Sequence, residues 1–196
     1  MITQNEIRIF VCFFPKLDSL TSKKIEDKSG LSHETIFRIL KGLVEKKYLI
    51  EKKVGKTNVY ELVKDRDLIY QVFVSYMIKK RLDFKEKHIL LYKRLYEFLN
   101  EFNPEGSALL FGSYAKGTEA KTSDIDLLCV TNKKNIQRVV QTFRTKYNIN
   151  IQPVVIKISD FKNIKKDNLQ FWMDLIEYGI VLDGLDLFFK EVYLND

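Results

Sequence analysis

Two aspartates, Asp124 and Asp126, stand one residue apart in the otherwise apolar segment SDIDLLCV. Side chains alternate along a strand, so both carboxylates are expected on one face, with Ile125 and Leu127 on the other. Carboxylates held this close repel each other where solvent screening is weak. A divalent cation removes the conflict, and Mg²⁺ or Mn²⁺ accepts carboxylate oxygens together with phosphate oxygens and water. The spacing therefore predicts a metal site at Asp124 and Asp126.

A Gly-Ser pair precedes the first aspartate by ten residues. SALLF, residues 107–111, predicts an apolar strand, and Gly112 and Ser113 turn from it into a segment that can begin a helix. Unpaired backbone N–H groups face outward at such a turn, and a glycine lets a ligand approach the main chain. This arrangement favours phosphate, with the Ser113 hydroxyl and the Lys116 ammonium as further donors. We therefore predict that Gly112, Ser113 and Lys116 bind a nucleotide whose phosphates the same metal bridges.

The order Gly-Ser, ten residues, Asp-x-Asp is similar to the signature of the DNA polymerase beta superfamily of nucleotidyltransferases. GSYAKGTEAKTSDIDLL looks most like the minimal nucleotidyltransferases of prokaryotes, some of which are antitoxins to HEPN-domain toxins. The resemblance covers about residues 104–196. It implies that Gly112 and Ser113 contact the triphosphate and that Asp124 and Asp126 are catalytic metal ligands. It also implies transfer of a nucleoside monophosphate from an NTP to a hydroxyl, with a HEPN-type toxin as one candidate acceptor.

The family pattern includes a third carboxylate on a later strand, as metal ligand and base for the attacking hydroxyl. Here the later strand is NINIQPVVIKI, and its polar members on one face are Asn150 and Gln152. An amide oxygen can bind a metal, but an amide cannot take a proton at neutral pH. Asp160 is a conceivable substitute, although its position favours capping of the next helix. The alternative to an enzyme is therefore a transcription regulator whose second domain is a catalytically silent nucleotide sensor.

Residues 1–62 begin with two short helices. NEIRIFVCFFPKL predicts a helix that ends near Pro15, because proline cannot continue the hydrogen-bond ladder. SLTSKKIEDKSG predicts a second helix with Thr21 or Ser22 as N-cap and Gly30 as its C-terminal stop. These signals place the first two elements of a small helical domain.

A third helix and a hairpin complete this N-terminal region. Ser32 is a good N-cap for the helix, which buries a stripe formed by Ile36, Leu40 and Leu43. YLIEKKV and NVYELV predict two strands joined by the turn GKTN, in which Gly55 takes a positive φ angle.

This order resembles a winged helix-turn-helix of archaeal and bacterial transcription regulators. The resemblance implies that the third helix enters the major groove of DNA and that the hairpin brings lysines to the phosphate backbone. The implied DNA-binding residues are Ser32, His33, Thr35, Arg38, Lys41, Lys52, Lys53 and Lys56. Residues 1–61 hold twelve Lys/Arg and eight Asp/Glu. A docking or dimerisation module is the alternative, because this excess of four cations is modest.

Helical periodicity continues through residues 63–103 as one long helix or two in tandem, and NPEG then breaks it. We expect an α+β protein with a winged helix-turn-helix at 1–62, a connecting helical segment at 63–103, and a polymerase-beta-like nucleotidyltransferase domain with a small mixed sheet at 104–196. The apolar side chains of YQVFVSYMI in the connector would also allow a homodimer.

The formal net charge of +7 fits an acidic partner such as DNA or nucleotide phosphates, or a lysine-rich solvated surface. Cys12 and Cys129 lie in apolar runs, where a thiol is usually buried. Trp172 is expected in the core rather than stacked on a base. No apolar stretch reaches the roughly 20 residues that a membrane span requires. The sequence thus predicts a cytoplasmic protein without membrane contact.

Overall fold

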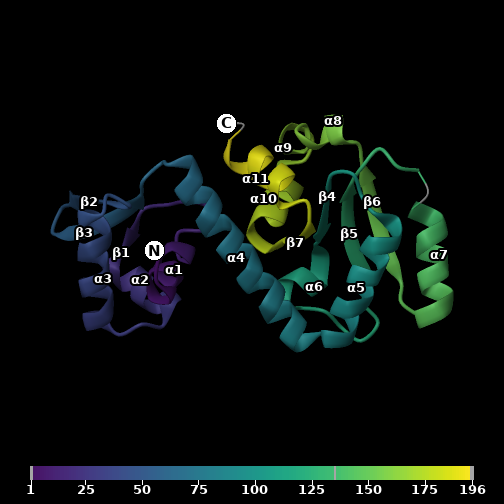
Figure 1. Ribbon diagram of the computed structural model, residues 1–196, viewed down its shortest axis with the longest axis horizontal. Helices are drawn as coiled ribbons and strands as arrows, with labels where there is room; N and C mark the ends of the chain where they lie inside the picture. The colour runs from purple at the N-terminus through teal and green to yellow at the C-terminus, as the bar shows by residue number, and fades with distance from the viewer. Residues whose placement is uncertain (1, 135, 195–196) are drawn as a thin grey trace. The chain divides into compact units, whose positions relative to one another are not determined.

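Helix α4, Arg66–Lys87, is shared between two structural units, residues 1–76 and 77–196. The computed structural model describes residues 2–134 and 136–194. Figure 1 traces the elements of each unit along the chain. Among the described residues, no helix combines the length and the apolar character needed to cross a bilayer.

Unit 1 contains the helices and the hairpin predicted from residues 1–62. Its elements are α1 Gln4–Val11, β1 Leu20–Thr21, α2 Ser22–Ser29, α3 His33–Glu45, β2 Leu49–Val54 and β3 Thr57–Leu62. Thr21 caps α2, and Gly30 ends that helix in the left-handed conformation. Ser32 caps α3, as its side-chain oxygen accepts from the Thr35 N–H. Local capping chemistry therefore fixes where these helices start and stop.

The three strands of unit 1 form an antiparallel sheet in the order β1-β3-β2. Gly55 takes a φ of +62° in the hairpin turn, as predicted. The predicted stripe on α3 is buried and consists of Ile36, Leu40 and Leu43. Helix α1 ends at Val11, earlier than predicted from Pro15. The next three N–H groups bond to carbonyls three residues back, so the chain tightens before the proline is reached.

Unit 2 is built on a four-stranded mixed sheet in the order β6-β5-β4-β7. Strands β5 and β6 are parallel, and the other two pairs are antiparallel. Its strands are β4 Ser107–Leu110, β5 Ile125–Val130, β6 Ile151–Ile156 and β7 Ile180–Asp183. Its helices after α4 are α5 Ile89–Phe102, α6 Gly112–Lys116, α7 Ile136–Tyr147, α8 Ile158–Phe161, α9 Ile164–Asp167, α10 Leu169–Tyr178 and α11 Leu185–Tyr193.

One face of this sheet packs against α5 and α7. The shared core includes Leu110, Leu127 and Cys129 from the strands and Phe98 and Phe143 from the two helices. The helical segment predicted as a connector is thus two helices, and α5 is part of the core of unit 2. The apolar face of α5 is buried against the sheet of unit 2, whose strands come later in the sequence. The sequence of residues 63–103 alone does not show this packing.

The other face of the sheet carries Leu109 and Val181, and α11 packs on β4 and β7. Trp172, Phe161 and Phe188 form a buried aromatic cluster, so the prediction of a core tryptophan is confirmed.

The predicted cap at Asp160 is wrong. Asp160 lies inside α8, whose N-cap is Lys157, and its carboxylate accepts a hydrogen bond from the Ser159 hydroxyl instead.

Candidate active site

Gly112 sits where β4 turns into α6, directly against the carboxylate of Asp126. Its φ is +68°, a conformation that glycine adopts without strain. A Cβ atom at this position would overlap Asp126 Oδ2. The preceding residue, Phe111, donates its N–H to the Asp126 carbonyl at 3.0 Å. Glycine is therefore required here both by the backbone angle and by the close approach of the acid.

Asp124 and Asp126 lie at the start of β5, on the face opposite the core residues Ile125 and Leu127. Asp124 is exposed, and Asp126 is half-buried. Burial raises the pKa of Asp126, and the negative charge of Asp124 raises it further. The predicted electrostatic conflict between the two acids is thus present.

Two amides, Asn150 just before β6 and Gln152 within it, lie beside Asp124. Asn150 Nδ2 donates to Asp124 Oδ1 at 2.6 Å, and Gln152 Nε2 lies 3.5 Å from Asp124 Oδ2. The parallel register pairs Asp126 with Gln152, and the Ile125 N–H donates to the Asn150 carbonyl. The sequence placed both amides on one face, but it gave no sign that they would bind Asp124 itself.

Ser113 and Lys116, the other predicted phosphate ligands, lie on α6. The Ser113 carbonyl accepts the N–H groups of Gly117 and Thr118, which closes this short helix. Lys116 Nζ donates to Asp174 Oδ2 on α10 at 2.6 Å. This hydrogen bond raises the pKa of Lys116 and lowers that of Asp174. The predicted phosphate donor is therefore held by an acid 58 residues further along, which no sequence signal marked.

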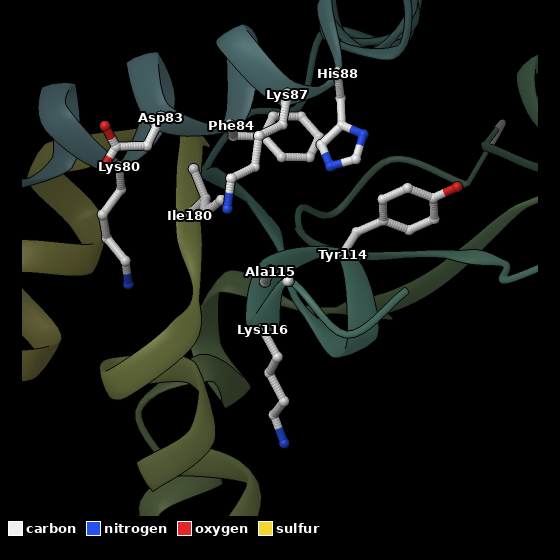
Figure 2. A pocket seen from close by; sticks show the side chains of 10 residues that line it. Lys80, Asp83, Phe84, Lys87, His88, Tyr114, Ala115, Lys116 and Ile180 are labelled. Atoms are coloured by element: carbon white, nitrogen blue, oxygen red, sulfur yellow. The ribbon is translucent and has the colours of Figure 1, made fainter. Parts of the chain in front are cut away.

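A separate hollow of about 170 Å³ lies beside α6 (Figure 2). It is lined by Lys80, Asp83, Phe84, Lys87, His88, Tyr114, Ala115, Lys116, Gly117 and Ile180. Lys80 donates to the carbonyls of Glu177 and Gly179, and burial lowers its pKa to about 8 against the opposing charge of Glu177. Neither Asp124 nor Asp126 lines this hollow, so it is distinct from the aspartate site.

A close contact between the side chains of His88 and Glu119 ties the loop after α6 to the start of α5. His88 Nε2 lies 3.2 Å from Glu119 Oε1, and both side chains are about one-fifth exposed. The His88 ring contacts Phe84 and, edge to face, Tyr114 of α6. The tethered loop leads directly to Asp124, so this contact fixes the approach to β5.

The aspartate site fits a divalent cation by its donor chemistry. Asp124 and Asp126 offer hard carboxylate oxygens of the kind that Mg²⁺ and Mn²⁺ prefer, and their mutual repulsion is relieved by positive charge. Within residues 2–134 and 136–194, no cluster of three or more His, Cys, Asp or Glu side chains is arranged to hold a metal.

The residues predicted to contact DNA all lie in unit 1, on α3 and the β2–β3 hairpin. On α3, Arg38 and Lys41 are exposed, and Thr35 is half-buried. Ser32 is engaged as the cap, donating to the Thr35 hydroxyl, and His33 lies 3.2 Å from a Glu26 carboxylate oxygen. Arg38 and Lys41 are thus two cations on the exposed polar face of α3 that take no part in capping the helix.

In the hairpin, Lys53 and Lys56 are exposed. Lys52 Nζ donates to Glu61 Oε2 on β3 at 2.6 Å, so its charge is partly satisfied within the hairpin. Sequence reasoning missed Phe37 of α3, whose side chain is 66% exposed on the face that carries the polar residues.

Residues 92–181, which contain both motifs, match the family model described as the nucleotidyltransferase domain. This segment is similar to nucleotidyltransferase domains. A Methanocaldococcus jannaschii protein, provisionally named a protein adenylyltransferase, is 37% identical over 93 residues. The alignment covers 43% of this chain and 62% of that protein, so the chain spans less than two thirds of its length. No solved structure matches the chain. The matched segment contains the Gly-Ser turn and both aspartates, so the sequence similarity covers the candidate site.

Replacing Gly112 by Ala tests the fit between the turn and Asp126. Gly112→Ala should destabilise unit 2 by about 2–4 kcal/mol, because a left-handed alanine costs about 1 kcal/mol and the new methyl group displaces Asp126. Gly117→Ala is the matched control, with a φ of +71° and open space around its Cβ position. Urea unfolding followed by the fluorescence of Trp172 measures both variants. An equal loss of unfolding free energy in the two variants would show that contact with Asp126 does not restrict residue 112.

Proposed function

We propose that the nucleotidyltransferase domain transfers a nucleoside monophosphate from an NTP to a hydroxyl, with Mg²⁺ or Mn²⁺ at Asp124 and Asp126. The observation that carries the proposal is the contact between Asp126 and Gly112, which sets two like-charged carboxylates directly beside the Gly-Ser turn. The family match of residues 92–181 supports the same reaction class.

Each residue has a defined part in this proposal. The backbone N–H groups at the start of α6 and the Ser113 hydroxyl bind the triphosphate, and Gly112 leaves room for it. Asp124 and Asp126 hold the cation, which when bound neutralises charge on the phosphates and on the attacking and leaving oxygens. Lys116 can also bind the triphosphate if its ammonium group leaves Asp174 for a phosphate group, which carries more negative charge than the carboxylate.

The amides beside Asp124 determine how fast such a reaction can run. In the proposal, Asn150 and Gln152 occupy the place of the family's third carboxylate and orient Asp124 by donating to it. Neither amide can accept the proton of an attacking hydroxyl. That proton must pass to the substrate or to water, so transfer should be slow. This observation favours the second candidate function, a nucleotide sensor with weak or no transferase activity.

The acceptor proposed for the active form is a protein hydroxyl. The support is the name of the Methanocaldococcus jannaschii relative, a protein adenylyltransferase, which also makes ATP the first nucleotide to test. A HEPN-type toxin remains a candidate for that acceptor protein, on the resemblance to minimal nucleotidyltransferases alone.

Unit 1 is proposed to bind DNA as a winged helix. Three helices followed by an antiparallel hairpin support this, as do the exposed Arg38 and Lys41 on α3 and Lys53 and Lys56 on the hairpin. Together with a nucleotide-binding domain, this unit would make the chain a regulator that responds to nucleotide.

Calorimetric titration of Mg²⁺ with ATP tests the nucleotide site. The wild type should bind ATP only with the metal, and Asp124→Asn/Asp126→Asn should bind at least about tenfold more weakly because both acidic ligands are lost. Asp167→Asn/Asp186→Asn removes two exposed acids elsewhere in unit 2 and serves as control. Equal binding of ATP by both double variants would exclude the aspartates as the metal site.

Restoring a carboxylate on β6 tests the role of the amides. Asn150→Asp or Gln152→Asp should raise the rate of AMP transfer from labelled ATP by about tenfold or more, because a base and a third acidic ligand become available. Asn148→Asp, which adds the same charge two residues before Asn150, is the control. If neither Asn150→Asp nor Gln152→Asp exceeds the control, the amides do not limit catalysis.

DNA binding by unit 1 is tested through its salt dependence. Arg38→Ala should weaken binding to the cognate operator, found by selection from genomic fragments. Removing Lys53 and Lys56 together should flatten the plot of log K against log salt by about 2 units, since each lost phosphate contact contributes about 0.9. Lys23→Ala/Lys24→Ala on α2 is the matched control. Unchanged binding in all variants would make unit 1 a docking module.

A further inference from the structure

One segment of this chain, residues 127–159, carries cations and no acids. The segment contains six Lys/Arg and no Asp/Glu, the six being Lys133, Lys134, Arg138, Arg144, Lys146 and Lys157. The whole chain has 33 Lys/Arg and 26 Asp/Glu, so 27 cations and 26 acids remain outside the segment. Of the net charge of +7, the segment thus supplies +6 and the rest of the chain +1.

Most of these cations lie on or beside helix α7. The inner side of α7 is apolar and buried on the sheet, through Ile136, Val139 and Phe143. Its exposed side is polar, and a shallow hollow there is lined by Arg138, Gln141, Thr142, Thr145 and Lys146. None of the six cations in the segment forms an ion pair with a carboxylate of the described residues.

This pattern differs from an ordinary solvated surface, on which charges of both signs alternate. The two short helices α8 and α9 illustrate the ordinary case, because Lys162, Lys165 and Lys166 stand between Asp160 and Asp167. On the exposed side of α7, by contrast, the side chains next to the cations are Gln141, Thr142 and Thr145. Lys, Arg, Gln and Thr are the side chains that most often contact the phosphate groups of nucleic acids.

We propose that the exposed face of α7 is a binding surface for the phosphate backbone of a nucleic acid strand. The contact is electrostatic and independent of sequence, because the surface offers charge and hydrogen-bond donors without base-specific geometry. The proposal concerns binding alone, and it holds whether or not the aspartate site transfers nucleotides.

The position of α7 gives this surface a link to the aspartate site. Helix α7 runs toward the end of the sheet at which β5 begins (Figure 1). Four residues after Lys146, the chain reaches Asn150, which donates to Asp124. A strand that lies along α7 would therefore have the aspartates at one end of its track.

The test uses the full chain and a fluorescein-labelled single-stranded oligothymidylate of about 20 nucleotides. The background carries Arg38→Ala/Lys41→Ala/Lys53→Ala/Lys56→Ala, which removes the exposed cations proposed for DNA binding in unit 1. Into it we introduce Arg138→Gln/Arg144→Gln/Lys146→Gln. The control is Lys162→Gln/Lys165→Gln/Lys166→Gln, which changes the net charge equally on the mixed-charge helices α8 and α9. Fluorescence anisotropy between about 50 and 200 mM salt gives the affinity and its salt dependence.

We expect the α7 substitutions to weaken binding by at least about tenfold at the lowest salt. They should also make the slope of log K against log salt shallower by about 2, at roughly 0.7 per lost contact with a single strand. The control should change the affinity less than threefold. Equal effects of the two triple variants would overturn the proposal. So would displacement of the oligonucleotide by polyglutamate at equal charge concentration, since that would identify an acidic protein as the partner.

Discussion

The repulsion between Asp124 and Asp126 is the constraint on which the arrangement around the site depends. Both acids must leave the apolar face of β5, so Ile125 and Leu127 enter the core while the carboxylates face the turn at Gly112. Burial and like charge together raise the pKa of Asp126, which means that its ionised form is held at a cost. Only a backbone without a side chain can approach Asp126 this closely. The positions of Gly112, Asp124 and Asp126 therefore depend on one another.

The contacts around Gly112, Asp124 and Asp126 hold these residues in place without neutralising the two carboxylates. Asn150 orients Asp124 by a neutral donor, and the nearest cation on α6, Lys116, is bound to Asp174 instead. The His88–Glu119 pair restrains the loop that leads into β5. The surrounding structure thus preserves a local excess of negative charge on two ordered carboxylates. Such an excess stabilises nothing by itself, and it is accounted for if a cation or a phosphate–metal complex binds there.

The sequence predicted the parts of this structure that depend on neighbouring residues. Ser32 and Gly30 mark helix ends, Gly112 marks the turn, and alternation places the aspartates on one face, because capping, backbone angles and strand geometry are local properties. The pairs Lys116–Asp174 and His88–Glu119 join residues far apart in sequence, so their existence depends on the packing of α10 and α5. The same reason explains why α5 looked like a connector. The cap expected at Asp160 was wrong for a local reason, because α8 begins at Ile158 with Lys157 as its N-cap.

The acid-free segment from Leu127 to Ser159 was readable from the sequence, but whole-chain composition hides it, because the net charge alone does not show where the cations are. Folding gives the segment its meaning. Helix α7 turns three apolar residues to the sheet and leaves Arg138, Arg144 and Lys146 exposed on its outer side. The chain then reaches Asn150, which donates to Asp124. Two acids alone would repel a phosphate-rich ligand at a distance. If the aspartate site binds a metal and a nucleotide as proposed, the positive field of the adjoining helix would offset that repulsion and bring phosphate groups to the site.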